Sequence, residues 1–112
     1  MSTTLLPSER RRSSRIPLVI SVRERSSEGV VMCVATDISQ SGMALKRASD
    51  SVARSPVTLE FSLPGIDGLV RVSARFIRQI QTASVQLGAV HFDSVPDTLT
   101  SWLSQCGHSP MT

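Results

Sequence analysis

The sequence predicts an all-β domain with one C-terminal helix, folded as a small six-stranded antiparallel β-barrel. Three observations predict this fold. Apolar and polar residues alternate with a period of two through most of the chain, turn-forming residues interrupt the alternation at short intervals, and one segment of helical spacing follows the last alternating run. Short strands at close spacing favour a closed barrel, and we expect the helix to cover an open end or edge of it.

The expected strands follow from the alternation. The clearest run begins at Val57, where every second residue is apolar and the residues between are polar. A five-residue loop with strong turn chemistry, residues 64–68, joins it to the next strand as a hairpin. Residues 26–29, 37–42 and 48–55 are polar and are expected to form turns or loops. The expected strands are residues 16–23, 30–36, 43–47, 57–63, 70–80 and 85–92.

The helix is expected after the last strand. Ser94 is a favourable N-cap residue, and Pro96 suits the first turn of a helix, where its missing N–H is not needed. Apolar residues recur at helical spacing and predict one buried stripe. These residues are Val95, Leu99, Trp102 and Leu103.

The chain is long enough for one domain, since it has 112 residues, 40% of them hydrophobic. Residues 1–14 are rich in Ser, Thr and Arg and are expected to form a flexible arm. Residues 15–105 are expected to form the barrel with its helix, and residues 106–112 a disordered tail. No second domain is expected within the chain.

The positive charge is concentrated near the N-terminus. The formal net charge is +3, and four of the 12 basic residues lie in the segment Arg10–Arg15. The rest of the chain carries nearly equal numbers of basic and acidic residues. Such a local cluster favours a compact anionic ligand over a long polyanion bound across a whole face.

Several classes of function are excluded by what the sequence lacks. No stretch approaches the roughly 20 apolar residues of a membrane-spanning helix, and the N-terminus lacks the apolar core of a signal peptide. We therefore expect a cytoplasmic protein without membrane insertion, in which Cys33 and Cys106 are free thiols. No metal-ligand pattern and no nucleophile with a base partner are present. We expect a receptor rather than an enzyme, with no cofactor and no metal.

Two short segments carry the chemistry of a binding site. Arg10-Arg11-Arg12-Ser13-Ser14-Arg15 precedes the first strand and contains no lysine. Arginine presents five N–H donors in one plane, pairs bidentately with phosphate and with the O6/N7 edge of guanine, and stacks on aromatic rings. In Asp37-Ile38-Ser39-Gln40-Ser41-Gly42, Asp37 and Ser39 can bond ring N–H groups or backbone, and Gly42 allows positive φ or close backbone approach. Together the segments suit a nucleotide.

These residues resemble the two-part signature of PilZ domains, which are bacterial receptors for cyclic di-GMP. Arg11-x-x-x-Arg15 followed by Asp37-x-Ser39-x-x-Gly42 fits that signature in only one register, because neither Arg10 nor Arg12 has an arginine four residues further on. The resemblance covers about residues 9–104. It implies a six-stranded barrel, in agreement with the alternation. One departure is that Gly88-Ala89-Val90-His91-Phe92 has one residue more than the family's Gly-x-x-Phe, which leaves the register of that strand open.

The resemblance implies that Arg10, Arg11, Arg15, Asp37, Ser39 and Gly42 bind cyclic di-GMP. The arm is expected to close over the ligand and to alter a surface for a separate effector protein. An arginine at position 10 resembles family members that bind an intercalated dimer of the ligand. Bacterial motility and biofilm formation are processes that the family implies.

Two other functions remain open from the residues. The first is a small basic β-barrel that binds RNA or single-stranded DNA through the arm, but such surfaces usually stack bases on exposed aromatics. The chain has one Trp, three Phe and no Tyr, all in patterns that face a core, so nucleic acid is not the favoured partner. The second, which the resemblance implies, is a ligand-blind adaptor of the PilZ type. Such members tend to lack the arginine motif, which is intact here.

Overall fold

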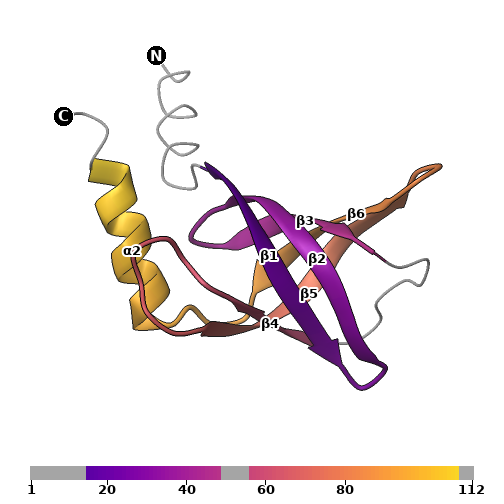
Figure 1. Ribbon diagram of the computed structural model, residues 1–112, viewed down its shortest axis with the longest axis horizontal. Coiled ribbons are helices and arrows are strands. Elements are labelled where there is room, and N and C mark those ends of the chain that lie inside the picture. The colour runs from indigo at the N-terminus through magenta and orange to yellow at the C-terminus, as the bar shows by residue number, and fades with distance from the viewer. Residues whose placement is uncertain (1–14, 49–55, 109–112) are drawn as a thin grey trace, which may run out of the picture.

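The computed structural model describes residues 15–48 and 56–108, which form a closed six-stranded barrel and one helix (Figure 1). All the strand pairs are antiparallel, and around the barrel the strands run in the order β1-β2-β3-β6-β5-β4. The expected fold class is confirmed. The elements are β1 Ile16–Ser26, β2 Gly29–Ile38, β3 Gly42–Arg47, β4 Val57–Phe61, β5 Val70–Gln81, β6 Gln86–Phe92 and α2 Asp97–His108.

The barrel closes because β1 pairs along one side with β2 and along the other with β4. Three irregularities in the ladders bend the strands, at Pro17–Ile20 in β1, at Ala35–Asp37 in β2 and at Phe76–Arg78 in β5. Bulges of this kind increase local twist and re-aim side chains. The pairing of β3 with β6 is regular throughout, so the additional residue after Gly88 forms no bulge there.

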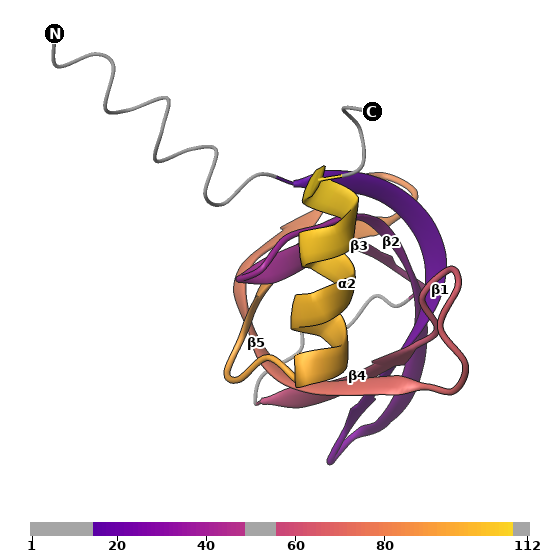
Figure 2. The ribbon, with the colours of Figure 1, turned by 90° about the vertical axis from the view of Figure 1, so that its left-hand side faces the viewer.

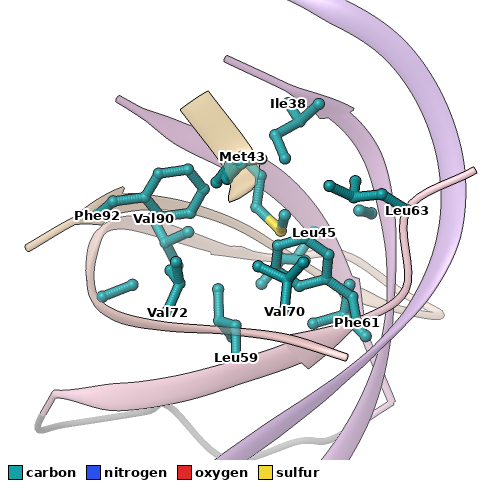
Figure 3. Packing of buried hydrophobic residues seen from close by; sticks show 14 of the residues in the cluster. Ile38, Met43, Leu45, Leu59, Phe61, Leu63, Val70, Val72, Val90 and Phe92 are labelled. Carbon is teal, nitrogen blue, oxygen red and sulfur yellow. The ribbon is translucent and has the colours of Figure 1, made fainter. Parts of the chain in front are cut away.

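The core fills the barrel with the inward residues of every strand (Figure 3). Side chains alternate between the two faces of a strand, so each second residue points inward. The inward set is apolar around Leu59, Phe61 and Met43, which are almost fully buried. The apolar positions of the alternation in the sequence correspond to this inward set.

The helix α2 lies across one end of the barrel, as expected (Figure 2). Its buried side chains Leu99, Trp102 and Leu103 extend the core, and the indole Nε1 of Trp102 donates a hydrogen bond of 3.0 Å to the carbonyl of Pro64. The helix begins after Pro96 and continues to His108, so the expectation that residues 106–112 form a disordered tail is wrong at its start. Cys106 packs against the core and extends the apolar stripe by one turn.

Polar side chains occupy the inward positions at the end of the barrel away from α2. Glu24, Arg47 and Gln86 are inward and almost fully buried. The guanidinium of Arg47 donates to both carboxylate oxygens of Glu24, at 2.7 and 2.8 Å, and to Oε1 of Gln86. It also lies 5.1 Å from the ring centroid of Phe76. These contacts satisfy the buried charges, and the Glu24 carboxylate raises the pKa of Arg47.

Both cysteines are free thiols, as the sequence predicted. Cys33 is buried beside Glu24, and burial together with that carboxylate raises its pKa to about 12. The thiolate is the reactive form of cysteine, so this thiol is inert at neutral pH. Within residues 15–48 and 56–108, no helix has the length and apolar character needed to cross a membrane.

Candidate functional site

Four of the six predicted site residues come together at the end of the barrel that α2 covers (Figure 1). Arg15 directly precedes β1, Asp37 lies near the end of β2, Ser39 follows β2, and Gly42 begins β3. The antiparallel pairing of β1 with β2 places Pro17 opposite Asp37 and so brings the two motifs together across 22 residues of sequence. Arg10 and Arg11 lie outside the described residues.

Asp37 lies on a strand rather than in a turn, because β2 extends to Ile38. The ladder with β3 shifts register between Ala35 and Asp37. The carboxylate Oδ1 of Asp37 accepts a hydrogen bond of 2.6 Å from Nη1 of Arg15. The side chains of Arg15 and Asp37 remain 49% and 27% exposed, so both keep polar atoms open to solvent. The pair is therefore a preassembled but accessible donor and acceptor.

Ser39 organises the turn between β2 and β3. Its hydroxyl accepts hydrogen bonds from the backbone N–H groups of Ser41 and Gly42, at 3.2 and 3.3 Å, and its own N–H donates to the carbonyl of Gly42 at 2.8 Å. The side chain is almost fully buried, and its Oγ lies 3.3 Å from Oγ of Ser41. Ser39 thus acts on this surface by fixing the turn, in the manner of a short Ser/Thr turn.

Gly42 is required by the close approach of two strands. It pairs with His91 of β6, and a Cβ at this position would lie 1.9 Å from the carbonyl oxygen of Val90. Its φ is not positive, so of the two roles expected for this glycine the structure shows close approach. The residue joins the turn at Ser39 to the β3–β6 ladder.

Gly42→Ala is expected to destabilise the protein by about 1–3 kcal/mol, as overpacking against a rigid backbone does. The clash is with main chain, so β3 must move away from β6, and the Ser39 turn must move with it. Urea unfolding measures the loss. Ser41→Ala, one residue earlier on the exposed surface, is the matched control and should stay within about 0.5 kcal/mol. Equal stability of the two variants would contradict the close approach.

Two exposed polar residues of this region were not predicted as binding residues from the sequence. Ser41 lies at the tip of the turn and contacts the hydroxyl of Ser39. His91 faces outward on β6, between Gly42 on one side and Arg75 on the other. The guanidinium Nε of Arg75 donates to Asp93 at 3.1 Å. Only the strand register shows that His91 and Arg75 neighbour the motif, because the sequence separation is large.

The aromatic side chains of the described region are buried or packed against the core. Phe61, Phe92 and Trp102 are buried, and Phe76 is half-buried beneath Arg47. The outer surface of the described barrel therefore offers no aromatic platform for stacking successive bases. This observation weighs against the RNA and single-stranded DNA alternative.

The arrangement can bind an anion that also carries hydrogen-bonding edges. Arg15 supplies a planar cation with several N–H donors, and Asp37 supplies an acceptor next to it. Because the Ser39 turn and Gly42 fix the backbone beside them, little ordering is needed at the barrel when a ligand binds.

The sequence matches a model of the PilZ domain family over residues 9–106, nearly its whole length. No curated protein is a significant match. The two sequence motifs and the four described site residues all lie inside the matched range.

Solved structures with this fold include several PilZ domains. The PilZ domain of CeSA from a cellulose-synthesizing bacterium has a TM-score of 0.62 and 22% identity, covering 89% of this chain and 100% of that one. The PilZ domain of Escherichia coli YcgR, solved with c-di-GMP, has a TM-score of 0.64 and 18% identity, covering 89% and 90%. Bacillus subtilis MotI/DgrA, an inhibitor of motility, has a TM-score of 0.73 and 16% identity, covering 91% and 52%, so this chain spans about half of its length.

Proposed function

The chain belongs to the PilZ domain family, and on that premise we propose that it is a receptor for cyclic di-GMP rather than an enzyme. The observation that carries the proposal is the Arg15–Asp37 pair, held on an open face beside the Ser39 turn. This pair joins the arginine motif to the aspartate motif in space. The family membership and the YcgR structure with c-di-GMP support the same ligand.

The arginines of the arm are proposed to grip the ligand. Cyclic di-GMP has two phosphates and two guanines, and a guanidinium matches both a phosphate and the O6/N7 edge of guanine. Arg15 directly precedes β1, and Arg11 lies four residues before Arg15 in the sequence. Both are proposed to contact a ligand that lies on the barrel over Asp37. The arm is proposed to close over that ligand.

Asp37 is proposed to recognise guanine. A carboxylate is an acceptor with two oxygens, and the N1–H and N2–H groups of guanine are neighbouring donors that can pair with both. In the structure Oδ1 already accepts from Arg15, so a bound guanine would join an existing pair. Ser39 and Gly42 are assigned positioning roles, because one is buried in the turn and the other packs on Val90.

The ligand is proposed to act through a separate effector protein. Binding would fix the arm on the barrel and so create or hide a surface next to it. Ordering a segment costs free energy that the ligand contacts must exceed. The similarity to MotI, an inhibitor of motility, supports motility as a regulated process, with biofilm formation a further candidate. A cytoplasmic location is part of this proposal.

Titration calorimetry with cyclic di-GMP tests the proposal. Binding at micromolar concentration or tighter is expected, and it should weaken as salt rises, because exposed arginine–phosphate attraction is screened. A fitted stoichiometry of two ligands per chain would support the intercalated dimer that Arg10 implies, and a value of one would exclude it. The absence of heat from folded protein would refute the receptor function, and an oligonucleotide titration would then test the nucleic-acid alternative.

A further inference from the structure

The outer face of β2 carries a row of apolar side chains. Val30, Met32 and Val34 are 52%, 50% and 39% exposed, at alternate positions of the strand. Outward positions of a small barrel are usually polar, and single exposed apolar residues need no explanation. Three in succession on one strand form a continuous apolar ridge, which is the kind of feature that marks an interaction site.

Two hollows flank this ridge. A hollow of about 790 Å³ is lined by Met32, Val34 and Lys46 among others, and a second of about 350 Å³ by Met32, Arg23 and Leu69 among others. Met32 and Ser21 line both, so Met32 stands between them. Methionine is flexible and polarizable and packs well against varied partners. The surface can therefore receive apolar side chains on either side of Met32.

Cations border the ridge on both sides. In the register of the sheet, Arg23 of β1 lies opposite Met32, Arg25 of β1 opposite Val30, and Lys46 of β3 opposite Val34.

Beyond β1 the border continues around one carboxylate, Glu60 of β4. Arg25 and Arg71 donate to its two oxygens through Nε, at 3.0 and 2.9 Å, and Arg23 lies 3.7 Å from Oε1. These hydrogen bonds hold the pKa of Glu60 below its ordinary value, so it stays charged.

The balance of charge on this surface is strongly positive. Among the described residues, this surface carries four cations, Arg23, Arg25, Lys46 and Arg71, against the carboxylate of Glu60, with Glu28 in the turn between β1 and β2. Arg25 and Arg71 have no acceptor other than Glu60 among the described residues. Their remaining N–H donors are available to another molecule. Arginine and methionine are both enriched in protein–protein interfaces relative to the rest of the surface.

We propose that the ridge Val30–Met32–Val34 and its cationic border form the docking surface for an acidic amphipathic segment of a partner protein. Charge complementarity selects this occupant, because apolar side chains of the segment fill the hollows while its carboxylates meet the arginines. A second copy of the chain is disfavoured, because the same surface on both copies would oppose cation to cation. Because β2 pairs with β1 along its length and with β3 from Cys33 to Ile38, it leaves little strand edge for β-augmentation, and the partner is proposed to bind a face.

This docking surface is proposed to be the one that binds the effector protein, and that role rests on the proposed function. Val34 precedes Asp37 by three residues on the same strand, about 10 Å at the rise of a β-strand. An arm fixed over Asp37 would therefore lie beside the Val34 end of the ridge. Ligand and effector would meet on neighbouring parts of β2.

Methionine methyl resonances report on this surface directly. The chain has four methionines, of which Met32 stands on the ridge and Met43 is buried in the core. The protein is labelled with methyl-¹³C methionine and titrated with a synthetic amphipathic helix of about 18 residues, five turns, with leucine on one face and glutamate elsewhere. The acidic peptide is expected to shift the Met32 methyl to saturation and to leave Met43 in place. The same peptide with lysine in place of glutamate should shift neither.

A charge-reversed variant tests the border. Arg23→Glu/Lys46→Glu is expected to weaken the acidic peptide at least about tenfold, which corresponds to 1.4 kcal/mol. It should leave cyclic di-GMP calorimetry unchanged, since neither residue belongs to the ligand site. The amide spectrum of the variant shows whether the variant is folded. The wild-type titration with the two peptides tests the proposal independently of this variant.

Three results would overturn the docking proposal: a silent Met32 methyl at millimolar acidic peptide, an equal response to the lysine peptide, or a Met32 shift on raising protein concentration alone. The last would indicate a second copy as the occupant. Loss of the cyclic di-GMP signal with an intact Met32 response would instead refute the receptor function and leave the surface standing.

Discussion

Replacing Arg11 and Arg15 together with alanine is expected to abolish cyclic di-GMP binding at micromolar ligand. Hydrogen bonds to charged groups contribute about 1.5–3 kcal/mol each, so either single variant should weaken binding by about 10- to 150-fold. Arg15 already contacts Asp37 at 2.6 Å, and its loss would also remove the partner that orients this carboxylate. Calorimetry on both single variants and the double variant measures the effect, with unfolding curves to show that the barrel is intact.

Two further variants separate geometry from charge. Arg12→Ala removes the same charge from the same segment but lies outside the motif spacing, so it should change affinity by no more than a few-fold. Arg11→Lys/Arg15→Lys keeps both charges and loses both planar forks, and it should bind nearly as poorly as the alanine pair. If Arg12→Ala were as damaging as Arg15→Ala, the arm would act as a diffuse cation and the motif assignment would be wrong.

The fold could be predicted from sequence because most inward positions of the strands are apolar. The alternation at Val57, Leu59 and Phe61 maps directly onto burial in β4. The same alternation places Glu24, Arg47 and Gln86 on the inward face of their strands, but these three residues are polar. A pattern of hydrophobicity cannot assign them to the core, because their burial depends on partners from other strands. The buried polar end of the barrel was accordingly missed.

The sequence predicted which residues form the candidate site, but not the different role of each residue. The spacing of the motifs grouped Asp37, Ser39 and Gly42 with Arg15, and in the structure Arg15 contacts Asp37 at the end of the barrel where Ser39 and Gly42 also lie. In the sequence, Asp37 and Ser39 have the same expected hydrogen-bonding role, whereas the structure separates an exposed carboxylate from a buried hydroxyl that fixes a turn. The close approach that was one of two roles expected for Gly42 is seen in its packing on Val90. These differences arise from the bulge in β2 and from the pairing of β3 with β6, both of which are tertiary features.

Breaking the buried Glu24–Arg47 pair is expected to cause a large loss of stability. Arg47→Met is expected to destabilise the protein by about 3–5 kcal/mol, because it leaves the Glu24 carboxylate buried without its cation. That is a large share of the stability of a domain of this size. Urea unfolding at neutral pH gives the free energy of unfolding from the midpoint and slope. Arg75→Met, the same substitution in the exposed pair with Asp93, is the matched control and should cost about 1 kcal/mol or less.

The double variant Glu24→Leu/Arg47→Met should recover much of the loss. Removing both charges leaves apolar side chains of similar length among Val22, Cys33 and Phe76, and such replacements are often neutral or stabilising. Most of the cost of the single variant would then be the penalty of an unpaired charge rather than the net contribution of the pair. Equal costs for Arg47→Met and Arg75→Met would contradict a buried ion pair. A double variant less stable than either single one would show that the pair itself, with Gln86, stabilises this polar end of the barrel.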